Sequence, residues 1–383
     1  MTTAPGTTAG SSPARLSPPA AARAARRRDR RVYLRSHPVL FALLCATRHR
    51  PVVRLGRTVL VHGTDAYREA LTRVPLDRTA PGTTGGAAAE LTDGGLLFDQ
   101  DGAAHRTARR ALATDLGSAA LARIRPHWQA VLAARIPALT AHGSLEIVDL
   151  AEELAGVTAA ALTGSTADPR RLARAAAAAA ASAAADHLPG PRPRRRRAAT
   201  AGAAARAAAE LTALLPDPLD AMLTVAAVNT TVAALPRAAA WCADAGLWPT
   251  VDAATAPGLA AELLRLTAPS PLLPRVAAAD ATVAGCPVRS GDRLVLVARH
   301  AAQAHRSGPA SGPAAAQAVF GAGPHACPGA GLARAQLADV LLALAPHRPV
   351  VTRARVDRRS ALPGYARLTV RPTAPAAGAR PGS

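Results

Sequence analysis

Near its C-terminus the chain carries a loop rich in glycine and proline, and an apolar helical pattern follows it at once. The segment VFGAGPHACPGAGLARAQLADVLL, from Val319 to Leu342, holds a single cysteine, Cys327. Its glycines permit backbone conformations and close approaches that other residues resist, while Pro324 and Pro328 stiffen the loop. A helix that begins just after Cys327 would stabilise a thiolate through its dipole and its unpaired N–H groups.

The same loop has the G-x-G-x-x-A spacing of a dinucleotide-binding turn, at Gly321, Gly323 and Ala326. That turn needs a buried strand directly before the glycines, whereas the preceding PAAAQAVF does not read as one. A phosphate-binding P-loop is excluded because the chain has no lysine. A lone cysteine before a helix is most often a buried structural residue, and the functional alternative is a thiolate ligand for haem iron.

Composition indicates a large, mainly helical protein. The chain has 383 residues, of which 49% are hydrophobic and only 2% aromatic, and alanine dominates the apolar set. Such a chain must pack through close helix contacts. Strand-like segments are short, at residues 51–61, 282–300 and 348–370, and they do not alternate regularly with helices. We therefore expect a mainly α protein with small β-sheets and not a doubly wound sheet.

The charge balance is strongly basic. The chain has 46 basic and 25 acidic residues, for a formal net charge of +21, which on its own favours a polyanionic partner. However, arginine without lysine, beside abundant alanine, glycine and proline, matches a GC-rich coding bias, and the basic runs lack the aromatic residues of single-strand binders. We expect no nucleic-acid partner, and an acidic protein partner fits better.

The cysteine spacing and the apolar runs indicate the compartment in which the protein is expected to act. The four cysteines form no C-x-x-C pair, so neither a zinc ribbon nor a redox dithiol is indicated. The apolar run from Val39 to Ala46 is too short to span a membrane, and no cleavage-type sequence closes it. We expect a cytoplasmic monomer without membrane contact, with a disordered basic segment over residues 1–31, one domain over 32–372 and a tail over 373–383.

The sequence FGAGPHACPG, followed by GLAR, resembles the haem-binding loop of the cytochrome P450 superfamily in its bacterial soluble form. The resemblance implies a triangular, prism-like helical fold that holds one haem b through Cys327 as the axial thiolate ligand of the iron. It also implies that Phe320 shields the sulfur and that His325 meets a haem propionate. Gly321 and Gly329 would let the backbone pass close to the flat ligand.

Other residues match the same family in the family's order. Glu262 and Arg265 match its E-x-x-R helix, in which a charge pair locks the core beneath the haem, and their spacing puts both on one helix face. Arg275, in the following PLLPR, falls where the family places an arginine on a propionate. His105 and Arg109 match the family's H-x-x-x-R helix, in which both side chains point at one anionic group. Each pair alone would be weak evidence.

The sequence AAVNTT, residues 226–231, corresponds to the family's oxygen-activating helix. In the family a local break in this helix leaves room for O2, and an acid and a threonine organise a proton relay. Thr230 falls at the relay threonine, Ala227 replaces the usual glycine, and Asn229 replaces the acid. Because an amide cannot donate a carboxylic proton, protons would come through Thr230, ordered water or the substrate. A purely helix-stabilising role for Asn229 stays open.

A second departure lies between His300 and Phe320, where the chain is shorter than the family. The missing part includes a further core arginine, and Arg299 and Arg306 are the two candidates to replace it.

The resemblance implies an oxidoreductase, specifically a monooxygenase that oxidises a small organic molecule in secondary-metabolite biosynthesis. The substrate would be free or bound to a carrier protein. A ferredoxin and a ferredoxin reductase would supply electrons, with docking on the basic side of the loop around His325 and Arg334. One alternative is a haem-thiolate peroxygenase, desaturase or oxidative coupling enzyme, which Asn229 favours. Another is a catalytically silent auxiliary of a glycosyltransferase or carrier protein, against which Cys327 argues.

Overall fold

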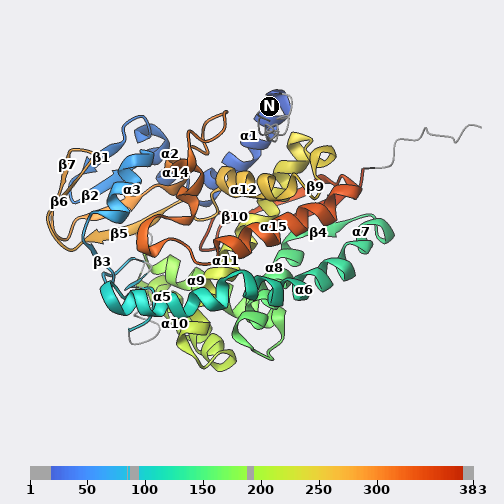
Figure 1. Ribbon diagram of the computed structural model, residues 1–383, viewed down its shortest axis with the longest axis horizontal. Helices are drawn as coiled ribbons and strands as arrows, with labels where there is room; N and C mark the ends of the chain where they lie inside the picture. Colours follow the sequence, from blue (N-terminus) through green and yellow to red (C-terminus); the bar gives the residue numbers. More distant parts are fainter. Residues whose placement is uncertain (1–18, 84, 87–94, 188–193, 374–383) are drawn as a thin grey trace, which may run out of the picture.

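Helices make up most of the protein, and three small sheets accompany them (Figure 1). The computed structural model describes residues 19–83, 85–86, 95–187 and 194–373. The prediction of a mainly α protein with small β-sheets is confirmed. The expected tail, residues 373–383, lies outside the described residues except for its first position.

The helices differ widely in length, and the short 3-10 turns are labelled η. In chain order they are α1 (Pro19–Ser36), α2 (Pro38–Thr47), α3 (Thr64–Thr72), α5 (Gly102–Leu116), α6 (Ser118–Arg135), α7 (Pro137–Ala141), α8 (Ile147–Thr163), α9 (Pro169–His187), α10 (Arg194–Leu214), α11 (Pro218–Ala245), η1 (Trp248–Thr250), α12 (Ala256–Thr267), α13 (Ala298–Ala301), α14 (Pro313–Gln317), η2 (Ala318–Phe320), η3 (Gly323–His325), α15 (Ala330–Leu344) and η4 (Ala345–His347).

The largest sheet lies at the left edge of Figure 1, away from most of the long helices. Its order is β1-β2-β8-β5-β3, and only the β2–β8 pairing is parallel. A second sheet has the order β4-β10-β9, and β6 and β7 form a hairpin. The strands are β1 (Val52–Leu55), β2 (Thr58–Val61), β3 (Leu76–Asp77), β4 (Leu145–Glu146), β5 (Leu273–Ala277), β6 (Ala281–Val283), β7 (Cys286–Val288), β8 (Arg293–Leu296), β9 (Val350–Asp357) and β10 (Gly364–Arg371).

The longest helix, α11, runs through the middle of the molecule and contacts α1, α8, α9 and α12. Asp217 caps its first turn, with its carboxylate accepting a hydrogen bond from the Leu219 N–H at 2.7 Å. Gly246 ends it in the left-handed conformation, at φ 65°. This helix is long and apolar enough to cross a membrane by length and composition, but residues 233–242 in its second half are buried in the core.

Alanine and glycine allow the helices around α11 to pack closely. Buried alanines of α8 and α9, including Ala155, Ala159 and Ala176, share one cluster with α10 and α11. At Gly156, where α8 meets the first residue of α9, an added Cβ would lie 2.0 Å from the carbonyl oxygen of Pro169. Only glycine permits that approach, so these helices pack at short range without large aromatic side chains.

The prediction that residues 1–31 are disordered is wrong for residues 19–31, because α1 begins at Pro19; residues 1–18 lie outside the described residues. The arginine-rich composition hid an inner face on this helix. Asp29 is only 4% exposed and lies 2.6 Å from Arg237 of α11 and 3.0 Å from Arg299. Tyr33 adds a hydroxyl that donates to the carbonyl oxygens of Thr267 and Ala268. These residues form the Asp29 network, which fixes α1 to the core.

Candidate functional site

The cysteine loop is a tight turn between η2 and α15. Gly321 and Gly323 have φ of 77° and 70°, in the region that favours glycine. The turn closes where the Cys327 N–H donates to the carbonyl oxygen of Phe320 at 2.7 Å. A Cβ at position 323 would meet Cγ2 of Thr72 at 3.0 Å, so α3 also holds the loop closely. The backbone therefore presents Cys327 just before α15 begins.

The thiol of Cys327 is accessible although protein surrounds it on most sides. Burial raises the pKa of this thiol, and the Gly329 N–H and the charges of Arg109 and Arg334 act in the opposite direction. Arg334 also lies 4.5 Å above the ring of Phe320. An accessible sulfur at the end of a rigid loop, with donors and cations around it, is suited to ligate a metal centre.

Beside the loop, four basic side chains from different elements converge, and we call them the basic cradle. Its members are Arg78, His105, Arg275 and His325. The imidazoles of His105 and His325 stack with their ring centroids 3.8 Å apart. Burial is the largest cause that lowers the pKa of Arg275, to about 10, and repulsion from Arg78 adds to it. Burial, Arg78 and His105 lower the pKa of His325 to about 4.

The cradle holds more donors than its surroundings can satisfy. Buried Nε atoms of Arg78 and Arg275, and Nε2 of His325, have no hydrogen-bond partner among the described residues. Asp101, whose side chain is 64% exposed, places Oδ1 3.6 Å from His325 Nε2. Unpaired buried donors are costly, so the cradle has the character of a site for an anion.

Sequence reasoning placed His105, Arg275 and His325 at this site but missed Arg78. Arg78 follows β3 directly, in a segment that carries no motif. Only its position after a strand of the main sheet brings it to Arg275, because β3 pairs with β5. A contact made through strand pairing across 200 residues of chain leaves no local signal in the sequence.

The three residues predicted on the oxygen-activating helix lie in the middle of α11. Asn229 donates its amide to the carbonyl oxygen of Val225 at 2.7 Å, and Thr230 donates its hydroxyl to that of Ala226 at 2.9 Å. The local break that the resemblance implies is absent, because α11 continues as α-helix through these residues. Ala227, where the family has glycine, is a strong helix former and favours the unbroken course.

The predicted core pair is present and is anchored to the shortened segment. Arg265 is 1% exposed and binds Glu262 through two nitrogens, Nε at 2.7 Å and Nη2 at 2.5 Å. Its third nitrogen, Nη1, donates to the carbonyl oxygen of Ala302 at 2.8 Å. Neither candidate for the missing core arginine binds Glu262. Arg299 belongs to the Asp29 network, and Arg306 is exposed.

A different arginine approaches this pair from α1. Arg26 donates to the carbonyl oxygen of Ala304 at 3.0 Å, and the charges of Arg265 and Glu262 both act on its pKa, which burial lowers. The N-terminal helix therefore contacts the segment between His300 and Phe320, which the sequence analysis gives as shorter than in the family.

Comparisons with known proteins place this geometry in a known fold. No family model matches the sequence, and no curated protein does so. Among solved structures, the cytochrome P450 CYP109B1 of Bacillus subtilis is similar with a TM-score of 0.69 and 17% identity, covering 88% of this chain and 99% of that one. The chain has the cytochrome P450 fold.

Two further structures with the P450 fold show the same extent of similarity. CYP109E1 of Bacillus megaterium, solved with testosterone, has a TM-score of 0.68 and 18% identity, and the match covers 89% of this chain and 99% of that one. P450BioI, solved with an acyl carrier protein that bears hexadec-9Z-enoic acid, has a TM-score of 0.68 and 17% identity over the same shares. At such identities the similarity concerns the fold, and the site must be argued from its residues.

The residues present fit the haem that the P450 fold accommodates. Cys327 would offer its sulfur to the iron, and the unpaired buried donors of the basic cradle would suit the two propionates of a haem b. Both features lie against the same loop, since His325 is two residues from Cys327. The donor set is therefore matched to a large, dianionic group with a metal at its centre.

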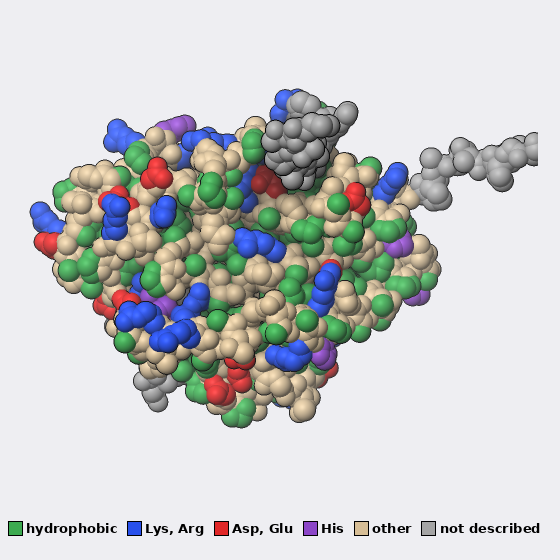
Figure 2. Space-filling model, viewed as in Figure 1, with side chains coloured by type: hydrophobic (Ala, Val, Ile, Leu, Met, Phe, Trp, Pro, Cys, Tyr) green, Lys and Arg blue, Asp and Glu red, His purple; other side chains and the backbone are tan. Residues whose placement is uncertain are grey.

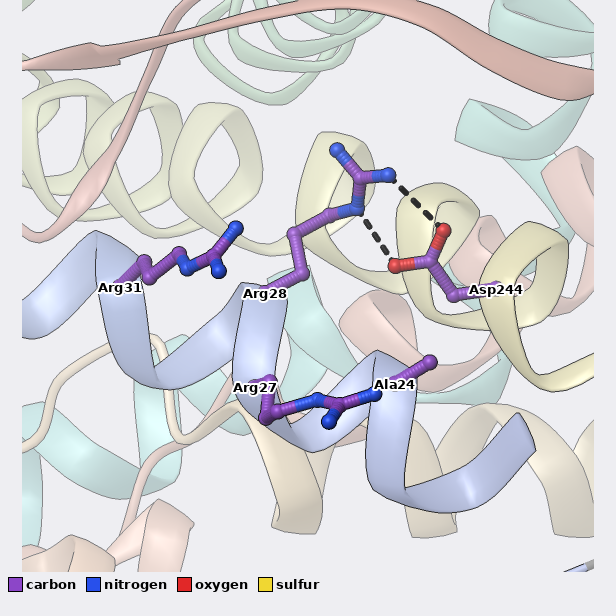
Figure 3. Close-up of a pocket in the computed structure, with 5 residues that line it drawn as sticks. All are labelled: Ala24, Arg27, Arg28, Arg31 and Asp244. Carbon is purple, nitrogen blue, oxygen red and sulfur yellow. Dashed lines mark hydrogen bonds and ion pairs between the residues drawn. The ribbon is translucent and has the colours of Figure 1, made fainter. Parts of the chain in front are cut away.

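A hollow of the surface at α1, apart from the cysteine loop, does not fit this role. It is a cleft of about 260 Å³ lined by Ala24, Arg27, Arg28, Arg31 and Asp244 (Figure 3). Figure 3 shows Arg28 turned to Asp244 of α11, and the two form hydrogen bonds of 2.5 and 3.0 Å. No cysteine or histidine lines it, so we assign the cleft to the packing of α1 on α11.

Proposed function

We propose that this chain is a haem-thiolate monooxygenase, a cytochrome P450 that oxidises a small organic molecule with O2. The observation that carries the proposal is the accessible thiol of Cys327 beside the basic cradle, within a P450 fold. Cys327 would be the axial ligand of a haem b, and Phe320, Gly321 and Gly329 would line the loop against it. A catalytically silent auxiliary would not need a cysteine ligand or unpaired basic donors beside it, so these residues argue against that role.

Bound haem supplies the oxygen chemistry, and a thiolate ligand favours cleavage of the O–O bond. The protein must keep that sulfur deprotonated and correctly placed. The Gly329 N–H and the charges of Arg109 and Arg334 favour the thiolate against the burial that raises the pKa of the thiol. Pro328 and the hydrogen bond from Cys327 N–H to Phe320 fix the direction of the side chain.

The cradle would hold the propionates. Arg78 and Arg275 would donate their unpaired Nε hydrogens, and the pKa of about 4 makes His325 a neutral donor in the absence of an anion. A propionate nearby would favour the charged imidazole and raise that pKa. His105 stacks on His325 and thereby fixes its ring plane.

Proton delivery would depend on Thr230 and water. The Thr230 hydroxyl proton is engaged with the Ala226 carbonyl oxygen, so its oxygen is left as an acceptor until the side chain rotates. Asn229 donates one amide hydrogen to Val225 and keeps its second hydrogen and its oxygen for water. Neither group is an acid at neutral pH, so a water chain must carry the proton that the reaction consumes.

Electrons would come from a ferredoxin and a ferredoxin reductase, and arginines scattered over the face in Figure 2 would favour an acidic partner. His325 would be engaged with a propionate, so Arg334 is the better docking candidate of the two residues predicted here. A carrier-bound substrate is one option, because P450BioI was solved with such a carrier. A role in secondary metabolism follows only from the family resemblance.

The reduced, CO-bound absorption spectrum tests the proposal. We expect a red-shifted thiolate Soret band in the wild type and in Cys286→Ser, which removes a partly exposed cysteine elsewhere. Cys327→Ser should lose the band. A wild type without this band, or a Cys327→Ser variant that keeps it, contradicts the haem-thiolate assignment.

Asn229 favours a second function, in which peroxide replaces O2 and reduced ferredoxin. A peroxygenase receives its oxygen already reduced and partly protonated, so it needs no acid on α11. Turnover driven by NADH through a ferredoxin, compared with turnover driven by hydrogen peroxide, separates the two. Faster ferredoxin-driven turnover in Asn229→Asp, with peroxide-driven turnover unchanged, would show that position 229 serves proton delivery to O2.

A further inference from the structure

Helix α2 is apolar on both of its faces. Phe41 and Leu44 point inward and are 6% and 1% exposed, whereas Val39 is 83% and Leu43 42% exposed. The exposed residues continue with Ala42 and Ala46, so positions 39, 42, 43 and 46 form one stripe at helical spacing. Such a stripe normally faces a core, and here it faces solvent.

Two exposed arginines of α1 lie shortly before this stripe in the chain, at the α1–α2 junction. Tyr33 of α1 and Phe41 of α2 meet edge to face, with ring centroids 5.1 Å apart. Both belong to one buried cluster that also includes Leu60 and Val297. Each of these two aromatic residues therefore marks the inner side of its helix at the junction.

Residues two positions away lie about 200° around a helix, on its opposite side. Arg31 and Arg35 flank Tyr33 at this spacing, and Val39 and Leu43 flank Phe41. Both arginines are exposed, and Arg31 also lines the cleft at α1 that holds the Arg28–Asp244 pair. We call these four residues the corner surface.

Further cations lie at the other end of α2. Arg48, His49 and Arg50 follow the helix directly, and the charges of Arg48, His49 and Arg306 all act on His305, so they lie close to one another. The sequence has no acidic residue from Arg30 to Thr64. An exposed apolar helix thus has cations at both ends and no neighbouring acid along the chain.

This combination favours a lipid surface over a protein partner. Protein interfaces centre on aromatic residues and arginine that fit pockets, whereas both aromatic side chains here point inward and the exposed apolar residues are all aliphatic. Helices at a bilayer interface bury aliphatic side chains at the headgroup boundary and meet anionic lipids with arginine. With ten residues, α2 is about 15 Å long, half the hydrocarbon thickness.

We propose that the corner surface binds reversibly to an anionic phospholipid bilayer, with Val39 and Leu43 at the acyl boundary and Arg31 and Arg35 on the headgroups. The contact would be peripheral, since α2 is too short to span. It is independent of the haem site and would bring the protein to a surface where apolar small molecules concentrate. It also revises the expectation of no membrane contact.

Co-sedimentation of the full chain with vesicles tests this proposal. We expect binding to equimolar phosphatidylglycerol and phosphatidylcholine, weaker binding to phosphatidylcholine alone, and loss of binding as salt rises. Arg31→Gln with Arg35→Gln should weaken binding about 25-fold, at about fivefold for each arginine near an anionic surface. Val39→Ser with Leu43→Ser should weaken it about tenfold or more.

Matched variants control for charge and for exposed apolar area. Arg106→Gln with Arg110→Gln removes the same charge from exposed positions on α5, at the opposite edge of the molecule in Figure 1. Val350→Ser removes an exposed valine, 44% accessible, from β9. Both should bind vesicles like the wild type, and circular dichroism should show every variant folded.

Three results would overturn the proposal. The first is equal binding to charged and neutral vesicles, and the second is wild-type binding by folded corner variants. The third is a dimer in size-exclusion chromatography that Val39→Ser with Leu43→Ser converts to a monomer while no variant binds vesicles, because the corner surface would then bind a second copy of the chain.

Discussion

The Asp29 network and the basic cradle both bury arginine side chains, but among the described residues only the network pairs a buried arginine with a buried carboxylate. Arg237 is fully buried and lies 2.6 Å from Asp29, and the charge of Asp29 opposes the burial so that the pKa of Arg237 is raised. In the cradle, Arg275 is buried beside Arg78 and forms no ion pair with a carboxylate of the part of the chain that the structure describes, and burial lowers its pKa to about 10. The described residues pair the arginine of the first cluster and leave donors of the second cluster without a partner.

The difference separates structural charge from functional charge. A chain that needs arginine for stability places an acid next to it, as α1 does for α11. A chain that binds an anion must leave its donors unpaired, and it accepts a local loss of stability in return for affinity. Removing one charged side chain should therefore lower the free energy of unfolding in the Asp29 network, but leave it unchanged or raise it in the basic cradle.

The largest effect is expected for Asp29→Ala. The change leaves Arg237 buried without its carboxylate, and breaking a buried ion pair from one side costs about 3–5 kcal/mol. Urea unfolding should show this loss in the free energy of unfolding. A loss below about 1 kcal/mol would mean that water reaches Arg237 and that the network is not structural.

The next largest effect is a loss of stability in acid that involves buried histidines. These side chains are neutral in the folded protein, so they need no buried carboxylate as a partner. His62 and His300 hydrogen-bond through their Nδ1 atoms at 2.9 Å, and burial lowers their pKa values to about 4 and about 2. His305 packs on His300, and burial and nearby arginines lower its pKa to about 4.

Below pH 6.5 these histidines bind protons in the unfolded chain but stay neutral in the folded protein. The free energy of unfolding is therefore highest above that pH and falls as the pH drops toward 4. For His62 the lowered pKa corresponds to roughly 3 kcal/mol. Free energies of unfolding measured from pH 7 to pH 4 should show the decline, and His62→Gln should flatten it. An unchanged slope in His62→Gln would place the acid sensitivity elsewhere.

Arg275→Gln should separate stability from binding in the cradle. Without bound haem, the variant should be as stable as the wild type or more stable, because it relieves repulsion with Arg78. Haem affinity should fall about 10- to 100-fold, which is the loss of one charged hydrogen bond. Haem titration and urea unfolding of the haem-free protein measure the two quantities. A destabilised haem-free variant with normal haem affinity would make Arg275 structural.

The sequence predicted those parts of the site that lie in local motifs. The loop that presents Cys327, the Glu262–Arg265 pair and the mainly α architecture all depend on residues close together in the chain, and their spacing reports them. Arg78 and the His62–His300 contact depend on which strands pair in the main sheet, as β3 with β5 and β2 with β8. Pairing between distant segments leaves no periodic pattern in one sequence.

Helix α1 was missed for a different reason. Its arginines and alanines match the composition of a disordered segment, and one acid among many arginines carries little weight in a charge count. The inner face is visible only when Ala25, Asp29, Val32 and Tyr33 are seen to share one side of a helix. The position of Asp29 on this inner face was therefore the sign of a core helix that the composition of the segment concealed.

The smallest effect is expected for Asp244→Asn, which tests whether burial makes the Asp29 network costly to break. Arg28 pairs with Asp244 as closely as Arg237 pairs with Asp29, but its side chain is 32% exposed at an open cleft (Figure 3). Water can replace the lost carboxylate, so the free energy of unfolding should fall by about 1 kcal/mol or less. Glu210→Gln, at an exposed pair with Arg171, is the control and should change it still less. A loss as large as that of Asp29→Ala would show that distance, and not exclusion of water, sets the cost of an unpaired arginine in this fold.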